Sequence, residues 1–175
     1  MTHRFHSLAL AAGCLIMAVG CEPSGSETAS SDADPAVLLS EAPADALSLT
    51  EVKERFGDEA TPAPSEVTLV GRIDAGEFDA FEPGSATFML SELPDEDHTG
   101  GDPDHADNCP FCKRRLANAP KAVVQLIDES GSVRTTRADN LAGLSKGDIV
   151  TVSGSVTYDE GVNLITIQSQ KIHVR

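Results

Sequence analysis

A side-chain period of two recurs along the chain and most constrains what it can fold into. Apolar and polar residues alternate in residues 66–74, 121–128 and 148–157, which is typical of strands with one buried face. We predict five strands, at residues 66–74, 86–92, 121–128, 148–157 and 163–174. The fold class is therefore all-β, with a small barrel or sandwich as its core.

Short helices are predicted at two places between these strands. Ser48 and Glu51 have the spacing of a capping box, in which each side chain accepts a hydrogen bond from the other's backbone N–H. This pattern predicts a helix over residues 49–56. Asp139 is expected to cap a second short helix that is closed by Gly147.

The order of these elements resembles the OB-fold, especially its anticodon-binding-like branch of nucleic-acid-binding domains. The resemblance covers residues 66–174 and is carried by Val70-Gly71-Arg72-Ile73 and by LSKGDIVTVSGSV at residues 144–156. It implies a five-stranded OB-like barrel with a binding face on strands two and three. Gly71 and Gly154 stand where a small barrel must bend its strands sharply.

The N-terminal 20 residues have the pattern of an export signal. A basic start leads into an apolar run over residues 8–20, which is too short to span a bilayer as a helix. The run ends in Ala18-Val19-Gly20-Cys21, which resembles the lipobox of bacterial lipoproteins. That resemblance implies lipidation of Cys21, with acyl chains such as palmitate, and cleavage before it.

The lipobox resemblance implies a membrane-anchored protein of the cell envelope that faces the periplasm or the outside. Cys14 also follows Ala-Gly, but cleavage there would leave residues 15–19 as an exposed apolar stretch, so Cys21 is preferred. Glu22 stands where some bacteria use aspartate to retain lipoproteins in the inner membrane. The choice between inner and outer membrane therefore stays open.

Composition divides the expected mature chain into a tether and one domain. Residues 21–45 are rich in Ser, Ala, Glu, Asp and Pro, and such a composition buries too little apolar surface to order itself. Residues 46–175 are long enough for one domain with its own core. Residues 93–120 are predicted to be an insertion between the second and third strands, where an OB-fold usually has only a turn.

The charge of the chain narrows its partners. It has 28 Asp and Glu against 13 Lys and Arg, a formal net charge of −15. Such a surface repels phosphate backbones, and with one Tyr and no Trp there are few rings on which bases can stack. Nucleic acid is therefore an unlikely partner, and the expected partners are the membrane, through the lipid, and an unidentified envelope protein.

The predicted insertion concentrates side chains that bind soft metals. His98, His105, Cys109 and Cys112 have the spacing H-x6-H-x3-C-x2-C. Two thiolates and two imidazoles suit tetrahedral zinc, and copper(I) is the alternative because soft thiolates also select it. The sequence therefore predicts a metal site at these four residues.

Thiol chemistry is the main alternative for the same segment. Cys109-Pro110-Phe111-Cys112 resembles the active-site tetrapeptide of glutaredoxin-like proteins, with Cys109 as nucleophile and Cys112 as resolving thiol. A structural disulfide is the simpler form of this hypothesis. No catalytic residue is predicted outside these thiols, so an enzyme is less favoured than a binding protein.

Two further hypotheses concern ligands rather than metals. An OB-like barrel can bind oligonucleotides or oligosaccharides, although the acidity and the scarcity of aromatic residues disfavour this here. Lys113, Arg114 and Arg115 follow the second cysteine of the pair. They are candidates for contact with an anion, or they form a solvated helix face or pair with nearby acidic residues.

Overall fold

The computed structural model describes residues 33–57, 65–100 and 105–175, and the predicted signal peptide and Cys21 lie outside them. The elements are η1 (Pro35–Val37), α1 (Leu49–Gly57), β1 (Ser65–Ile73), β2 (Thr87–Ser91), α2 (Glu96–Thr99), α3 (His105–Asn108), α4 (Pro110–Asn118), β3 (Lys121–Leu126), α5 (Ala138–Ala142), β4 (Ile149–Asp159), β5 (Leu164–Ser169) and β6 (Ile172–Val174). Within these ranges, no helix is long and apolar enough to cross a membrane.

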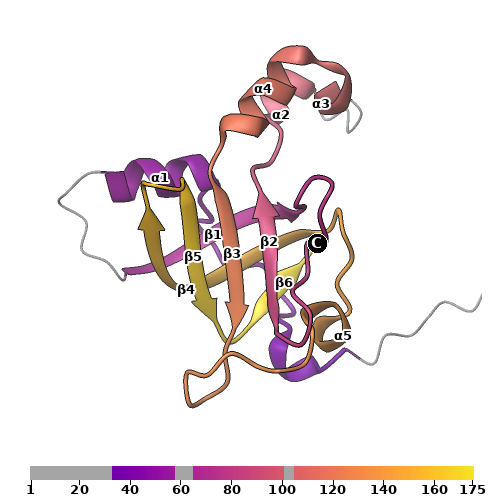
Figure 1. Cartoon of the computed structure of the whole chain (residues 1–175), viewed down its shortest axis with the longest axis vertical. Coiled ribbons are helices and arrows are strands. Elements are labelled where there is room, and N and C mark those ends of the chain that lie inside the picture. Colours follow the sequence, from indigo (N-terminus) through magenta and orange to yellow (C-terminus); the bar gives the residue numbers. More distant parts are fainter. Residues whose placement is uncertain (1–32, 58–64, 101–104) are drawn as a thin grey trace, which may run out of the picture. The chain divides into compact units, whose positions relative to one another are not determined.

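Five of the strands close into a barrel (Figure 1). Its strand order is β1-β2-β3-β5-β4, and β4 pairs back with β1 over the ladder from Ser65↔Val156 to Arg72↔Ile149. All pairings in the barrel are antiparallel except that of β3 with β5. The predicted all-β, OB-like barrel is thus confirmed, and so is the insertion between β2 and β3.

Two glycines mark places where neighbouring strands approach closely. A Cβ on Gly71 would lie 3.1 Å from Leu90 Cβ, and a Cβ on Gly154 would lie 2.0 Å from the Gln168 carbonyl oxygen. Because the backbone of neither residue has a positive φ, the requirement at both places is for space rather than for backbone conformation. These close approaches let β1 and β4 bend round a small core.

The apolar positions of the strands alternate into one continuous core. The largest fully buried side chains of the strands are Leu69, Ile73, Phe88, Leu90, Val124, Leu126, Ile165, Ile167 and Ile172. Leu49 and Val52 of α1 are also fully buried, so this helix packs against the barrel. Burial of this surface is the main source of stability of the domain.

The last predicted strand, residues 163–174, is wrong as a single element. Its two parts both pair with β4, β5 from Leu164↔Asp159 to Gln168↔Ser155 and β6 from Ile172↔Val152 to Val174↔Val150. Between the two ladders, β4 has two residues and its partner has three, so one extra residue lies on the partner's side. An extra residue on one strand is a β-bulge, which bends the strand and increases its twist. The Ser169 hydroxyl stabilises the bend by donating to the Ser153 carbonyl at 2.7 Å.

The second helix is also shorter than predicted. Arg137, not Asp139, is the N-cap of α5, and Gly143 ends the helix with a φ of 67°, four residues before Gly147. A glycine in the left-handed conformation is the usual way to end a helix. For α1 the prediction is confirmed, because Ser48 N donates to Glu51 Oε2 at 2.8 Å and Glu51 N donates to Ser48 Oγ at 3.2 Å.

Part of the segment predicted as tether belongs to the folded domain. Val37 in η1 is fully buried, and the backbone N–H of Leu39 donates to the Ile172 carbonyl at 2.8 Å. The apolar run Ala36-Val37-Leu38-Leu39 was the signal for this packing. The ordered domain therefore begins before residue 46, and the remainder of the predicted tether, residues 21–32, lies outside the described residues.

Candidate metal centre

The insertion leaves the barrel from β2 and returns to it through β3, and it carries three short helices, α2, α3 and α4 (Figure 1). None of its described residues belongs to the apolar core of the domain. Helix α4, its longest element, buries none of its own residues. The described contacts that hold the insertion together are therefore polar ones or those of the His/Cys cluster.

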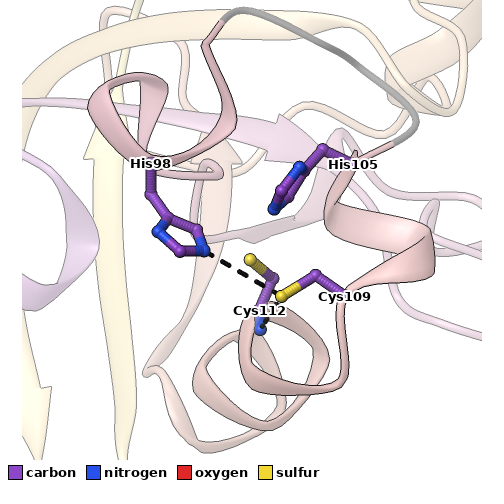
Figure 2. Close-up of side chains that lie close together, drawn as sticks. All are labelled: His98, His105, Cys109 and Cys112. Carbon is purple, nitrogen blue, oxygen red and sulfur yellow. Dashed lines mark hydrogen bonds between the residues drawn. The ribbon is translucent and has the colours of Figure 1, made fainter.

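The four residues predicted as metal ligands are brought together at one point of the insertion. One donor atom from each of His98, His105, Cys109 and Cys112 lies within 4.8 Å of all the others, and the side chains point toward a common centre (Figure 2). Cys109 Sγ lies 3.9 Å from His98 Nε2. The two imidazole rings meet edge to face, with centroids 5.2 Å apart.

Local backbone geometry positions three of the four. Cys109 is the N-cap of α4, and its sulfur accepts a hydrogen bond from the backbone N–H of Cys112 at 3.4 Å. Pro110, in the first turn, is preset for the helical φ and needs no donor there. The N–H of Cys109 donates to the His105 carbonyl at 2.9 Å, so these two residues lie one helical turn apart. His98 comes from α2.

Burial around the cluster is uneven. His98 is exposed, whereas His105 and both cysteines are half-buried. His105 Nε2 is itself buried and has no hydrogen-bond partner among the described residues. A buried polar atom without a partner costs stability, and coordination of an ion would satisfy it.

The pKa values of the two thiols are shifted in opposite directions. The pKa of Cys109 is lowered to about 6, first by the Cys112 backbone N–H and next by the His98 side chain, which stabilise the thiolate. The pKa of Cys112 is raised, chiefly because its thiol donates to the Cys109 sulfur, with burial as the second cause. One thiolate is therefore available at neutral pH before any ion binds.

The donor set fits a tetrahedral soft or borderline ion. Bonds of about 2.0 Å to nitrogen and 2.3 Å to sulfur place the donors of a zinc site roughly 3.3–3.8 Å apart. The donors here lie within 4.8 Å, so a contraction of about 1 Å completes such a site. The group can therefore hold a metal ion, and two thiolates would balance its double positive charge.

The basic triplet lies on α4 and is exposed. Arg115 is already engaged, because its NH1 contacts Asp95 Oδ2 at 3.0 Å. This ion pair joins the residue before α2 to the last turn of α4. The sequence suggested an acidic partner for the triplet but could not identify it.

A buried carboxylate connects α1 to the root of the insertion, which we define as residues 92–95 and 118–120, where the insertion joins β2 and β3. Glu92 is 5 % exposed and accepts hydrogen bonds at 2.7 Å from both the backbone N–H and the hydroxyl of Thr50. An anion near the first turn of a helix is favourable. A cavity of about 690 Å³ lies beside this contact, lined by residues of α1 and of the root. No local pattern around Glu92 indicates this contact, since its partner is 42 residues away.

Comparisons with known proteins add little to this picture. No protein-family model and no curated protein matches the chain. Among solved structures it is similar to the aspartyl tRNA synthetase from Entamoeba histolytica, at 15 % identity and a TM-score of 0.33. The match covers 67 % of this chain and 20 % of the synthetase, so the chain corresponds to about a fifth of that enzyme. The OB-like assignment therefore rests on the strand pairings.

Proposed function

We propose that this chain is a lipid-anchored cell-envelope protein whose OB-like barrel carries a zinc centre on the insertion between β2 and β3. His98, His105, Cys109 and Cys112 are the proposed ligands, with copper(I) as the alternative ion. The proposed anchor is the acylated Cys21, and the proposed partner beyond the membrane is another envelope protein.

One observation carries the metal proposal: donors from two separate parts of the insertion converge within 4.8 Å, although no apolar core draws them together. His105 Nε2, buried and without a described partner, points to the same conclusion. Four protein ligands leave no open position, as is typical of structural rather than catalytic zinc. The ion would therefore act, for as long as it is bound, as the cross-link that orders the insertion.

The metal proposal is tested by elemental analysis of the full-length protein, purified in detergent without added metal or chelator. We expect about one zinc per chain in the wild type and none in a Cys109→Ser/Cys112→Ser variant. Copper instead of zinc would change the ion but keep the site. Absence of both metals from the wild type, even after incubation with zinc, would overturn the proposal.

The anchor is tested separately, by mass spectrometry of the N-terminal peptide of membrane-extracted protein. We expect a diacylated Cys21 as the first residue of the wild type and no lipid modification of a Cys21→Ala variant. A Cys14→Ala variant is the matched control and should be lipidated normally. Modification at Cys14, or an unmodified N-terminus, would contradict the proposed anchor at Cys21.

Thiol–disulfide exchange is the second candidate, and the position of Cys109 favours it. In this reaction the Cys109 thiolate attacks a substrate disulfide, and Cys112 then resolves the mixed disulfide, leaving a Cys109–Cys112 disulfide and a reduced substrate. Because the pKa of Cys109 is lowered to about 6, iodoacetamide should alkylate it, in metal-free protein, well before Cys112 at pH 7. Exchange activity that survives His98→Ala and His105→Ala would favour the redox function over the metal function.

Recognition of nucleic acid by the barrel is less favoured by the described side chains. Phe88 of β2 and Phe81, which pairs with it in a single bridge, are 1 % and 7 % exposed and belong to the core. Buried rings cannot stack with bases. The barrel is therefore proposed as a carrier of the insertion.

A further inference from the structure

The outer surface of α4 combines an exposed aromatic ring with positive charge, whereas Phe78, which is 81 % exposed, lies between Glu77 and Asp79. Phe111, between the two cysteines, is 79 % exposed. Lys113 and Arg114 are also exposed, and Arg114 follows Phe111 by three residues, so the two share a helix face. The helix has three basic residues and no acidic one, in a chain with a net charge of −15.

An aromatic ring beside arginine is the usual centre of a protein–protein contact. Nothing in the described domain covers Phe111, so its ring is available to pack against a partner. The adjacent cations fit an acidic partner surface, because opposite charges accelerate encounter and orient the two proteins. We call Phe111, Lys113 and Arg114 the α4 face.

The α4 face also adjoins the metal ligands directly. Phe111 and Lys113 are the chain neighbours of Cys112 on either side, and Phe111 follows Cys109 by two residues. His98 is exposed and comes from α2, whereas His105 belongs to α3 and the two cysteines to the start of α4. An incoming donor can therefore reach the centre beside His98 while a partner is docked on α4.

We propose that the α4 face docks an acidic protein that has cysteine and histidine donors of its own and exchanges zinc with the cluster. This inference rests on the proposed zinc function. Each bond from zinc to a partner donor replaces one to this chain, beginning with His98. Zinc stays divalent and no electron is transferred. Of the protons released by the partner's thiols, one is taken up at Cys112 and the rest pass to the solvent, because Cys109 stays a thiolate at neutral pH.

The test measures zinc transfer from the full-length, zinc-loaded protein to two synthetic peptides. Both peptides have the same two cysteines and two histidines, flanked in one by glutamates and in the other by lysines. Because the flanks also alter a peptide's own zinc affinity, the decisive quantity is how the ratio of the two transfer rates changes between protein variants. The variants are the wild type, Lys113→Glu/Arg114→Glu and Phe111→Ser.

The rate ratio is the rate of transfer to the glutamate-flanked peptide divided by the rate to the lysine-flanked one. At low salt we expect this ratio to be about tenfold higher for the wild type than for Lys113→Glu/Arg114→Glu. Added salt should shrink this difference. Phe111→Ser should slow transfer to both peptides without changing the amount of zinc bound. A matched Lys171→Glu variant, with its charge change at an exposed residue of the barrel, should behave as the wild type.

Several outcomes would overturn the inference. A rate ratio that is the same in the wild type and the charge-reversed variant would show that the α4 face does not select partners. Binding of vesicles rich in phosphatidylglycerol that is lost in Lys113→Glu/Arg114→Glu, with an unchanged rate ratio, would assign the face to a membrane instead. If the wild type binds no zinc in the preceding elemental analysis, the proposed function itself fails and the inference fails with it.

Discussion

The barrel and its insertion are held together in different ways. The barrel has a continuous apolar core to which every strand contributes, and its backbone is tied by ladders that close on themselves. The described part of the insertion contributes nothing to that core, and its ties include an exposed ion pair, the hydrogen bond that the Asn163 amide donates to the Asn118 carbonyl, and the His/Cys cluster. The difference teaches that stability of the fold and order at the site are largely separate quantities in this protein.

The sharpest test of this comparison is to remove the proposed zinc ion. Chelation of the zinc-loaded protein should abolish hydrogen-exchange protection in α2, α3 and α4, because the cross-link is then lost. The strands of the barrel should keep their protection. Amide exchange measured by mass spectrometry checks both regions at once, and loss of protection in the strands would show that the two regions are one cooperative unit.

Truncation of one leucine in each region should give unequal losses. Leu69 is fully buried in the core, so Leu69→Ala should cost about 2–5 kcal/mol of the free energy of unfolding. Leu116 in α4 is only half-buried, and Leu116→Ala should cost less than about 1 kcal/mol. Urea unfolding of both variants provides the comparison, and equal costs would contradict the separation.

Glu92 lies at the boundary, where the two regions meet. Glu92→Ala removes the acceptor of both Thr50 hydrogen bonds and should cost about 2 kcal/mol in thermal or urea unfolding. Glu51→Ala, on the exposed side of the same helix, is the matched control and should cost about half as much. If both variants unfold like the wild type, α1 does not depend on the root of the insertion.

The smallest effect is expected at the ion pair of Arg115 with Asp95. Both side chains are substantially exposed, at 56 % and 41 %, so Arg115→Ala should change the free energy of global unfolding by less than about 1 kcal/mol. Its effect should be confined to exchange rates in α2 and α4. A larger global loss would mean that the pair supports the barrel as well.

Local patterns in the sequence predicted the local elements of the fold. The capping box of Ser48 and Glu51 acts within one turn, and strand alternation reports burial residue by residue, so both could be read directly. The bulge between β5 and β6 could not be predicted in this way, because it depends on the register in which these two strands pair with β4. Packing of Val37 was hidden by the polar composition around it.

The candidate site divides in the same way. The four predicted ligands were recognisable because their residue types and spacing carry the chemistry, and the structure places their donors together. The contacts of Glu92 with Thr50 and of Arg115 with Asp95 join residues 42 and 20 positions apart. Only the path of the chain through the barrel and insertion brings those partners together.

Pairing of Leu90 with Ala122 means that the insertion starts and finishes on adjacent positions of one ladder. To the barrel, the whole segment between them is one hairpin connection, and the entropy of closing such a connection rises only with the logarithm of its length. Evolution can lengthen, shorten or rewrite the segment with little consequence for the scaffold. The same junction makes the protein suited to grafting, with a foreign metal-binding loop exchanged for the native one.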